Sequence, residues 1–214
     1  MLLARQGKLS LDDDVRKLLP EMHDYGTPVT IRQLVHHTSG VRDYLTLMAI
    51  AGLSSSNDYP DAMVVDLIAR QRELNFKPGD EHLYSNSGYF LMSEIVRRAS
   101  GVSLREYAEK HIFGPLGMKS THFHDDTSMV VKNRAIGYSP APGGGWALDM
   151  SIFHVVGDGG VMTTVEDLAI WDRQFYEPTI EGGRELIAEM QMPATLNSGE
   201  KLQYAAGLVV GTHR

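Results

Sequence analysis

The sequence predicts an α+β fold in which helices dominate and strands begin only towards the C-terminus. Residues 1–114 carry most of the helix signals, namely capping patterns followed by apolar residues at helical spacing. Residues 115–160 contain Pro140, Pro142 and a run of three glycines, which indicate a loop-rich region. Residues 161–214 combine a further helix signal with an alternating apolar segment that is typical of a strand.

Five segments carry the start or periodicity signals of individual helices. Apolar residues at helical spacing, with a capping box before the first segment, predict helices over residues 30–40, 61–72 and 87–101. Capping boxes also predict shorter helices after Ser103 and Thr163, because each of these residues is followed three positions later by Glu.

Both ends of the chain resemble parts of larger elements. Residues 1–6 resemble the last turns of an amphipathic helix, and residues 202–210 alternate like a strand after the turn at 197–199. A single strand is marginal alone and needs a sheet to join. We therefore expect a chain truncated at both ends, with an incomplete sheet. An exposed strand edge would then favour self-association of the isolated chain.

Composition excludes several classes of function. The formal charge of −7 argues against a nucleic-acid partner, because phosphate binding needs clustered Lys and Arg. The chain has no Cys, so disulfides, thiolate metal sites and cysteine nucleophiles are excluded. No stretch of about 18 apolar residues exists, and we expect no transmembrane segment. These features do not identify the compartment.

The triplet Tyr84-Ser85-Asn86 is the main candidate for a functional site. It follows a Pro78-Gly79 turn and precedes an apolar segment of helical periodicity. A phenol and a carboxamide that flank one residue on such a loop can both face a reacting centre. The alternative is structural, with the tyrosine anchoring the loop and Asn86 acting as the helix N-cap.

A family resemblance supports the functional interpretation. Four segments, in order, resemble the serine β-lactamase-like and penicillin-binding-protein-like hydrolases, most closely the class C β-lactamase and esterase-like branch: residues 34–44, 76–86, 115–121 and 157–164. The resemblance covers essentially the whole chain and implies one domain over residues 1–214. It also implies a β-lactamase/transpeptidase-like fold, in which a helical region packs on an antiparallel sheet.

The resemblance implies roles for two residues of the triplet. Proteins of this family use a serine and a lysine in an S-x-x-K motif, a Tyr-x-Asn motif, and a K-T-G or H-x-G strand. Tyr84 would be the general base and acid, and Asn86 the amide that orients the lysine and the substrate. A tyrosine needs a nearby cation to act as a base at neutral pH, because its usual pKa is about 10.

The nucleophile motif is not evident in this chain. Ser198 and Lys201 fit S-x-x-K literally, but they follow a turn and precede the alternating segment, so we expect a hairpin turn there. Ser39 is better explained as part of a helix end than as a nucleophile. The resemblance implies that S-x-x-K lies just before Met1 and that the third motif lies just after Arg214.

Histidines and glycines give no comparable signal. His122 and His124, like the pair His36-His37, could suggest a metal site, but no H-E-x-x-H motif occurs, and structural histidines are the better interpretation. The glycine run at 143–145 lacks the Lys-Ser/Thr of a phosphate-binding loop. We expect neither a metal nor another cofactor.

Three aromatic residues are candidates to line a substrate cleft, although packing within the core or a loop explains them equally well: Tyr138, Trp146 and Phe153.

Three functions follow, in order of support. The first is a serine hydrolase that forms an acyl-enzyme with a small-molecule or peptide substrate: a β-lactam, a D-amino-acid peptide or an ester. The second is a non-catalytic binding or regulatory domain of the same fold. The third is a metal hydrolase that uses His122 and His124. The resemblance alone implies an exported protein, periplasmic or extracellular.

Overall fold

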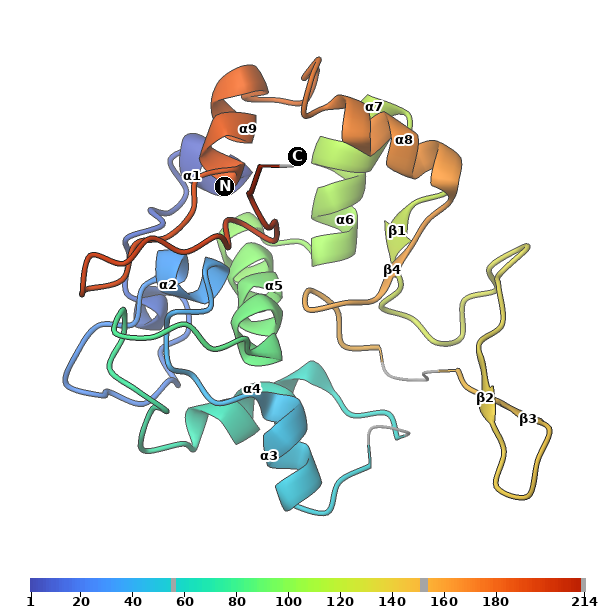
Figure 1. Ribbon diagram of the computed structural model, residues 1–214, viewed down its shortest axis with the longest axis horizontal. Helices are drawn as coiled ribbons and strands as arrows, with labels where there is room; N and C mark the ends of the chain where they lie inside the picture. The colour runs from blue at the N-terminus through green and yellow to red at the C-terminus, as the bar shows by residue number, and fades with distance from the viewer. Residues whose placement is uncertain (55–56, 151–153, 213–214) are drawn as a thin grey trace.

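The computed structural model describes residues 1–54, 57–150 and 154–212. Helices are the main regular elements of the described part, with short helices around one longer helix and two small antiparallel sheets (Figure 1). In chain order the elements are α1 (Leu2–Arg5), the 3-10 helix η1 (Val15–Lys17), α2 (Ile31–Val35), α3 (Tyr44–Ile50), α4 (Asp61–Ala69), α5 (Asn86–Ser100), α6 (Leu104–Ala108), the π-helix η2 (Glu109–Phe113), α7 (Gly114–Leu116), β1 (His122–Phe123), β2 (Tyr138–Pro140), β3 (Trp146–Leu148), β4 (Val161–Met162), α8 (Val165–Arg173) and α9 (Gly183–Met190).

Helix α5 is the centre of the fold. Its side chains Phe90, Leu91 and Ile95 are almost fully buried in the larger core cluster. Gly88 lets α5 approach α2 closely, because a Cβ atom there would lie 3.0 Å from the carbonyl oxygen of Leu34. With 15 residues, α5 is shorter than a membrane-spanning helix. Among the described residues no helix combines the length and apolar character needed to cross a membrane.

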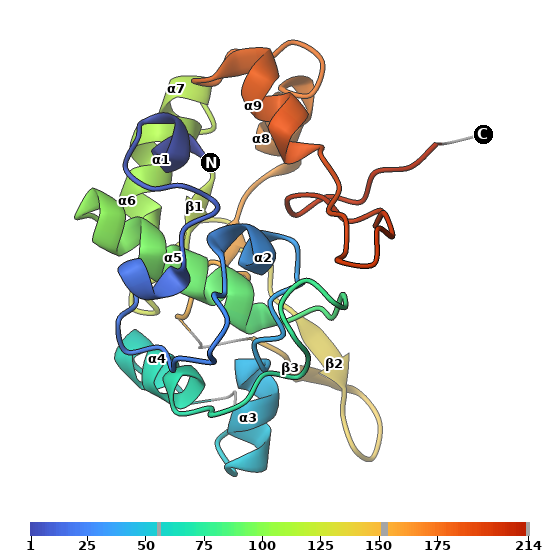
Figure 2. The same ribbon diagram turned by 90° about the vertical axis from the view of Figure 1, so that its left-hand side faces the viewer.

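Two groups of elements lie on opposite sides of α5. Helices α3 and α4 lie at one end, and α1, α6, α8 and α9 lie at the other (Figures 1 and 2). A second buried cluster joins this second group, with side chains from α1, α6, α9 and the segment before α9: Leu2, Leu3, Tyr107, Ile180, Leu186 and Ile187. Helix α5 belongs to the first cluster, and its Val96 and Ala99 also pack against the second. A third, smaller cluster lies around Phe113.

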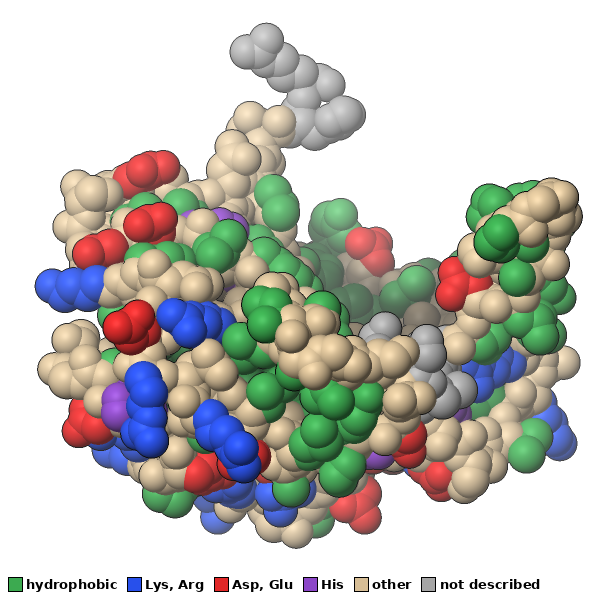
Figure 3. Space-filling model, turned by 90° about the horizontal axis from the view of Figure 1, so that it is seen from below, with side chains coloured by type: hydrophobic (Ala, Val, Ile, Leu, Met, Phe, Trp, Pro, Cys, Tyr) green, Lys and Arg blue, Asp and Glu red, His purple; other side chains and the backbone are tan. Residues whose placement is uncertain are grey.

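The two sheets each consist of two short antiparallel strands. Strand β1 pairs with β4, with His122 opposite Met162, and β2 pairs with β3, with Ser139 opposite Ala147. The β2–β3 hairpin projects from the body and carries exposed hydrophobic side chains (Figures 1 and 3). Tyr138 and Trp146, which sequence suggested as cleft residues, lie on this hairpin and are exposed. Phe153 lies outside the described residues.

Local capping signals located two helices correctly. Thr30 and Ser103 form complete capping boxes with Gln33 and Glu106, as predicted. The prediction for Thr163 was wrong by one residue. Thr164 caps α8, because its side chain accepts from the Asp167 amide, whereas the hydroxyl of Thr163 is bonded to that of Thr121, 2.7 Å away.

The helix predicted over 30–40 ends early in the structure, and the strand predicted over 202–210 does not form. Helix α2 stops at Val35, and His37 takes a left-handed conformation with φ 55°. The strand is wrong because the chain turns back at Gly207, where φ is 73° and the Ala205 amide bonds to the Leu208 carbonyl. Only isolated bridges remain in this part of the described chain.

We predict that Ser103→Ala lowers the free energy of unfolding by about 1 kcal/mol, because the Glu106 amide loses its capping acceptor. Urea unfolding followed by circular dichroism measures the change. Ser103→Asp is the matched control, since an aspartate at the N-cap keeps an acceptor. Equal loss in both variants would contradict a capping role for Ser103.

Candidate active site

Tyr84, Ser85 and Asn86 lie where the loop after residue 80 enters α5. Ser85 is the N-cap residue and Asn86 is the first residue of the helix. The part of the structural alternative in which Asn86 caps the helix is therefore wrong. The Ser85 side chain makes no capping bond, and its buried hydroxyl has no partner among the described residues. The triplet thus places Asn86 in the first turn of α5 and Tyr84 immediately before the N-cap, with the serine buried between them.

Asp43 fixes the orientation of Asn86. One carboxylate oxygen of Asp43 lies 2.7 Å from both the backbone nitrogen and the side-chain nitrogen of Asn86. The other oxygen accepts from the Thr46 amide at the start of α3. Because a carboxylate only accepts, the Nδ2 group of Asn86 must face Asp43. The Asn86 Oδ1 atom is therefore left to accept a hydrogen bond from another group.

Tyr84 is more than half exposed, at 56%. Partial burial raises the pKa of its phenol, and the nearby Tyr204, Asp158 and Asp43 raise this pKa further. All of these effects oppose ionisation, so Tyr84 carries its proton at neutral pH. In this environment Tyr84 is a proton donor, and it becomes a base only if a cation approaches it.

A cavity of about 510 Å³ lies beside Asn86. Asn86 lines it together with Tyr44, His124, Arg134 and Asp158, among others. The Tyr44 hydroxyl donates to Asp158 Oδ2 at 2.7 Å, which anchors the glycine-rich 157–160 segment to the start of α3. Burial raises the pKa of the Asp158 carboxyl. The cavity combines one cation with carboxylate and amide acceptors, which suits a polar substrate.

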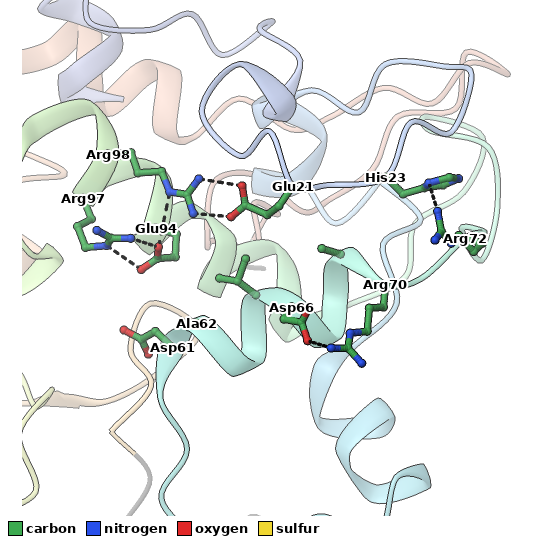
Figure 4. A pocket seen from close by; sticks show the side chains of 12 residues that line it. Glu21, His23, Asp61, Ala62, Asp66, Arg70, Arg72, Glu94, Arg97 and Arg98 are labelled. Atoms are coloured by element: carbon green, nitrogen blue, oxygen red, sulfur yellow. Dashed lines mark hydrogen bonds and ion pairs between the residues drawn. The ribbon is translucent and has the colours of Figure 1, made fainter.

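A second cavity, of about 570 Å³, lies between α4 and α5 (Figure 4). Most of its basic side chains point toward acidic ones: Arg97 and Arg98 pair with Glu94, and Arg98 also pairs with Glu21. Arg72 instead contacts His23. Arg70 pairs with Asp66 on α4. The arginines are therefore already paired, and the acidic group left without a hydrogen bond among the described residues is the buried Asp61 Oδ1. The cavity offers a ligand few free charges and is a weaker candidate for the active site.

The structure also shows the surroundings of the two serines that the sequence did not favour as nucleophiles. Ser198 is exposed in a turn, where its hydroxyl accepts from the Glu200 amide and Thr195 bridges to Lys201. The predicted hairpin turn is confirmed. Ser39 is buried, and its hydroxyl accepts from the Val41 amide just after the end of α2.

His122 and His124 lie together at the β1–β4 sheet. The Nε2 atom of His122 is 3.3 Å from Nδ1 of His124. Burial is the main cause that lowers the pKa of both imidazoles, so both are neutral near pH 7. Within residues 1–54, 57–150 and 154–212, no group of three His, Asp or Glu side chains is arranged to hold a metal ion.

Comparison with known proteins places the chain in a family. A family model described as Beta-lactamase matches residues 1–214, and the chain belongs to this family. A D-aminopeptidase of Brucella canis is 26% identical over 198 residues, which are 92% of this chain and 37% of that protein. The chain thus spans little more than a third of the length of such curated relatives.

Solved structures confirm the expected β-lactamase/transpeptidase-like fold. The octameric penicillin-binding protein homologue from Pyrococcus abyssi is 29% identical, with a TM-score of 0.79 over 98% of this chain and 49% of that one. The penicillin-binding protein from Bacillus halodurans is 26% identical, with a TM-score of 0.74 over 91% of this chain and 59% of that one. The sheets described here are partial relative to these larger neighbours.

We predict that Asp43→Ala lowers the free energy of unfolding by about 2 kcal/mol, because it removes an N-cap and leaves the Asn86 donors without a charged acceptor. A double-mutant cycle with Asn86→Ala should show coupling of about 1 kcal/mol, measured by urea unfolding. Additive losses would mean that the Asp43–Asn86 bond contributes nothing.

We also predict a pH-dependent difference between the protein and its Asp158→Asn variant. The folded-state pKa of Asp158 is raised above its unfolded value of about 3.9. A carboxyl with a raised pKa favours folding below the unfolded pKa, and this contribution is lost as pH rises through the folded pKa. The free energy of unfolding of the variant, measured with urea between pH 3.5 and about 7.5, should therefore increase relative to that of the unmodified protein as pH rises. A shift in the opposite direction would contradict burial as the dominant cause.

Proposed function

We propose that this chain forms part of a serine hydrolase that acts through an acyl-enzyme on amide or ester carbonyls. The observation that carries the proposal is the fixed geometry at the start of α5. Asp43 holds the Asn86 amide so that its Oδ1 atom is free to accept, and Tyr84 stands exposed two residues before it. Membership of the β-lactamase family and the D-aminopeptidase relatives support the same chemistry.

In the proposed reaction a serine hydroxyl attacks the carbonyl carbon, and the bond to the leaving group breaks after its protonation. The serine proton passes to the Tyr84 phenolate, which the lysine ammonium keeps ionised, and Tyr84 then donates this proton to the leaving nitrogen or oxygen. In the second half-reaction Tyr84 takes a proton from the water that attacks the acyl-enzyme and returns it to the serine oxygen as the acid is released. Asn86 Oδ1 accepts from the lysine or from the substrate amide. The relatives are longer than this chain, and we propose that the serine and lysine lie outside its 214 residues.

We propose D-amino-acid peptides or amides as the first substrate class to test, with β-lactams and simple esters as alternatives. The D-aminopeptidase relatives motivate this order. The cavity beside Asn86 fits it chemically, because Asp158 and Asp149 offer carboxylates to an ammonium group and Arg134 offers a cation to a carboxylate.

The test is turnover of a chromogenic D-amino-acid anilide, a β-lactam and a nitrophenyl ester by the full-length protein. Tyr84→Phe should lower kcat by about a hundredfold, because it removes the proton-transferring hydroxyl. Tyr138→Phe is the matched control, since Tyr138 lies on the exposed β2–β3 hairpin. Unchanged turnover in Tyr84→Phe would reject the assigned role.

A non-catalytic binding domain is the second candidate. The raised pKa of Tyr84 favours it, because a neutral phenol surrounded by acidic groups binds ligands but does not activate a nucleophile. Mass spectrometry after incubation with a β-lactam separates the two functions. A covalent adduct supports the hydrolase, and saturable binding without an adduct supports the binding domain.

A further inference from the structure

His37 lies directly behind Tyr84 and has an unusual backbone conformation. Its φ of 55° falls in the left-handed region, which non-glycine residues rarely adopt. In the described part of the chain only Asn133 shares this property among non-glycine residues. His37 is also 2% exposed, so this conformation belongs to a buried and well-packed site. Such conformations persist only where surrounding contacts determine them.

The contacts of His37 bracket Tyr84 on both sides. The His37 carbonyl accepts from the Leu83 amide at 3.0 Å, and the Nδ1 atom of its ring accepts from the Ser85 amide at 3.2 Å. The imidazole also packs on the Tyr84 ring, with the ring centroids 4.4 Å apart and the planes 38° apart. One residue therefore holds the backbone immediately before and after Tyr84 and also supports its ring.

The far side of the His37 ring is held by two further tyrosines. His37 Nε2 lies 3.1 Å from the Tyr204 hydroxyl, which donates to the Tyr89 hydroxyl at 3.5 Å. The Tyr89 hydroxyl in turn donates to the Val35 carbonyl at 3.1 Å. The imidazole is thus fixed at both nitrogens.

The hydrogen bonds select one tautomer of His37. A backbone amide can only donate, so the bond from Ser85 requires an unprotonated Nδ1. The proton of a neutral imidazole must then lie on Nε2, which donates to Tyr204. The Tyr204 hydroxyl then donates to Tyr89, and the Tyr89 hydroxyl donates to the Val35 carbonyl, so both hydroxyl hydrogens have an acceptor.

We propose that His37 is a positioning residue for Tyr84: a neutral imidazole, protonated at Nε2, that clamps the backbone on both sides of Tyr84 and fixes the direction of its phenol. The catalytic meaning of this clamp rests on the proposed function, whereas the clamp itself does not. Burial, followed by the nearby His82, lowers the pKa of His37 to about 4, so the imidazole is neutral at physiological pH.

The first test measures amide hydrogen exchange by NMR in His37→Ala and His37→Asn. Asparagine tolerates the left-handed conformation, and its Oδ1 atom can take the place of Nδ1 as acceptor. His37→Ala should speed exchange at Ser85 at least tenfold, while Ile95 in the middle of α5 changes less than threefold. His37→Asn should recover most of the protection at Ser85. Equal changes at Ser85 and Ile95 in His37→Ala would overturn the clamp.

A second measurement needs no variant, so it decides the question even if His37→Ala does not fold. The imidazole ¹⁵N spectrum of the unmodified chain at pH 7 should show a protonated Nε2 and an unprotonated Nδ1. A protonated Nδ1 would overturn the proposal, because the Ser85 amide could not then donate to it.

The third measurement tests whether His37 affects catalysis. In the full-length protein, His37→Asn should lower kcat about tenfold and leave KM within about threefold. Asparagine keeps the acceptor for the Ser85 amide but removes the ring that packs on the Tyr84 phenol, while the substrate cavity beside Asn86 is unchanged. An unchanged kcat together with a confirmed tautomer would reduce His37 to a structural residue and overturn the positioning role. Absence of turnover in the unmodified protein would reject the proposed hydrolase instead, and the exchange and ¹⁵N data would still decide the clamp.

Discussion

The hydrogen bonds that the Asp43 carboxylate accepts are the interactions on which the site depends. It lies where the N-termini of two helices meet, and each of its oxygens accepts from one of them: the Thr46 amide of α3 and the Asn86 amide of α5. Helix N-termini carry partial positive charge and unsatisfied amides, so a single anion can stabilise both ends at once. The next residue, Tyr44, is buried and bonded to Asp158. Two segments distant in sequence, the start of α5 and residues 157–160, therefore converge on two adjacent residues.

Sequence predicted the fold best where the deciding interactions are local. The capping boxes at Thr30 and Ser103 need only residues within one helical turn, and both were found correctly. Thr163 offered the same local pattern, but its hydroxyl is taken by Thr121, which is 42 positions away. The predicted strand over 202–210 failed for a related reason. Alternation signals a strand only where the backbone stays extended, and the left-handed Gly207 reverses the chain.

The residues of the candidate site show the same difference between local interactions, which sequence can predict, and distant ones, which it cannot. Tyr84 and Asn86 could be predicted as candidates because they lie two positions apart in sequence and match a recognisable motif. The residues that position them are not adjacent: Asp43 contacts Asn86 across 43 positions and His37 contacts Ser85 across 48. Both lie in the 34–44 segment, which sequence identified only as a family feature. Single-sequence reasoning could not pair the two segments, because nothing local in either one specifies the other.

The electrostatics of the described site indicate which kind of partner it favours. Tyr84 retains its proton because burial, Tyr204 and two carboxylates oppose ionisation, and Asn86 presents an oxygen because its amide hydrogens are bound to Asp43. Both features favour a partner that brings positive charge or N–H donors. A lysine ammonium supplies both, since it would lower the pKa of Tyr84 and donate to Asn86 Oδ1. The S-x-x-K lysine of the proposed mechanism therefore matches the electrostatic demand of residues far from it in sequence. With a neutral partner, the Tyr84 phenol would keep its proton, and the cavity beside Asn86 would bind a ligand without activating a nucleophile.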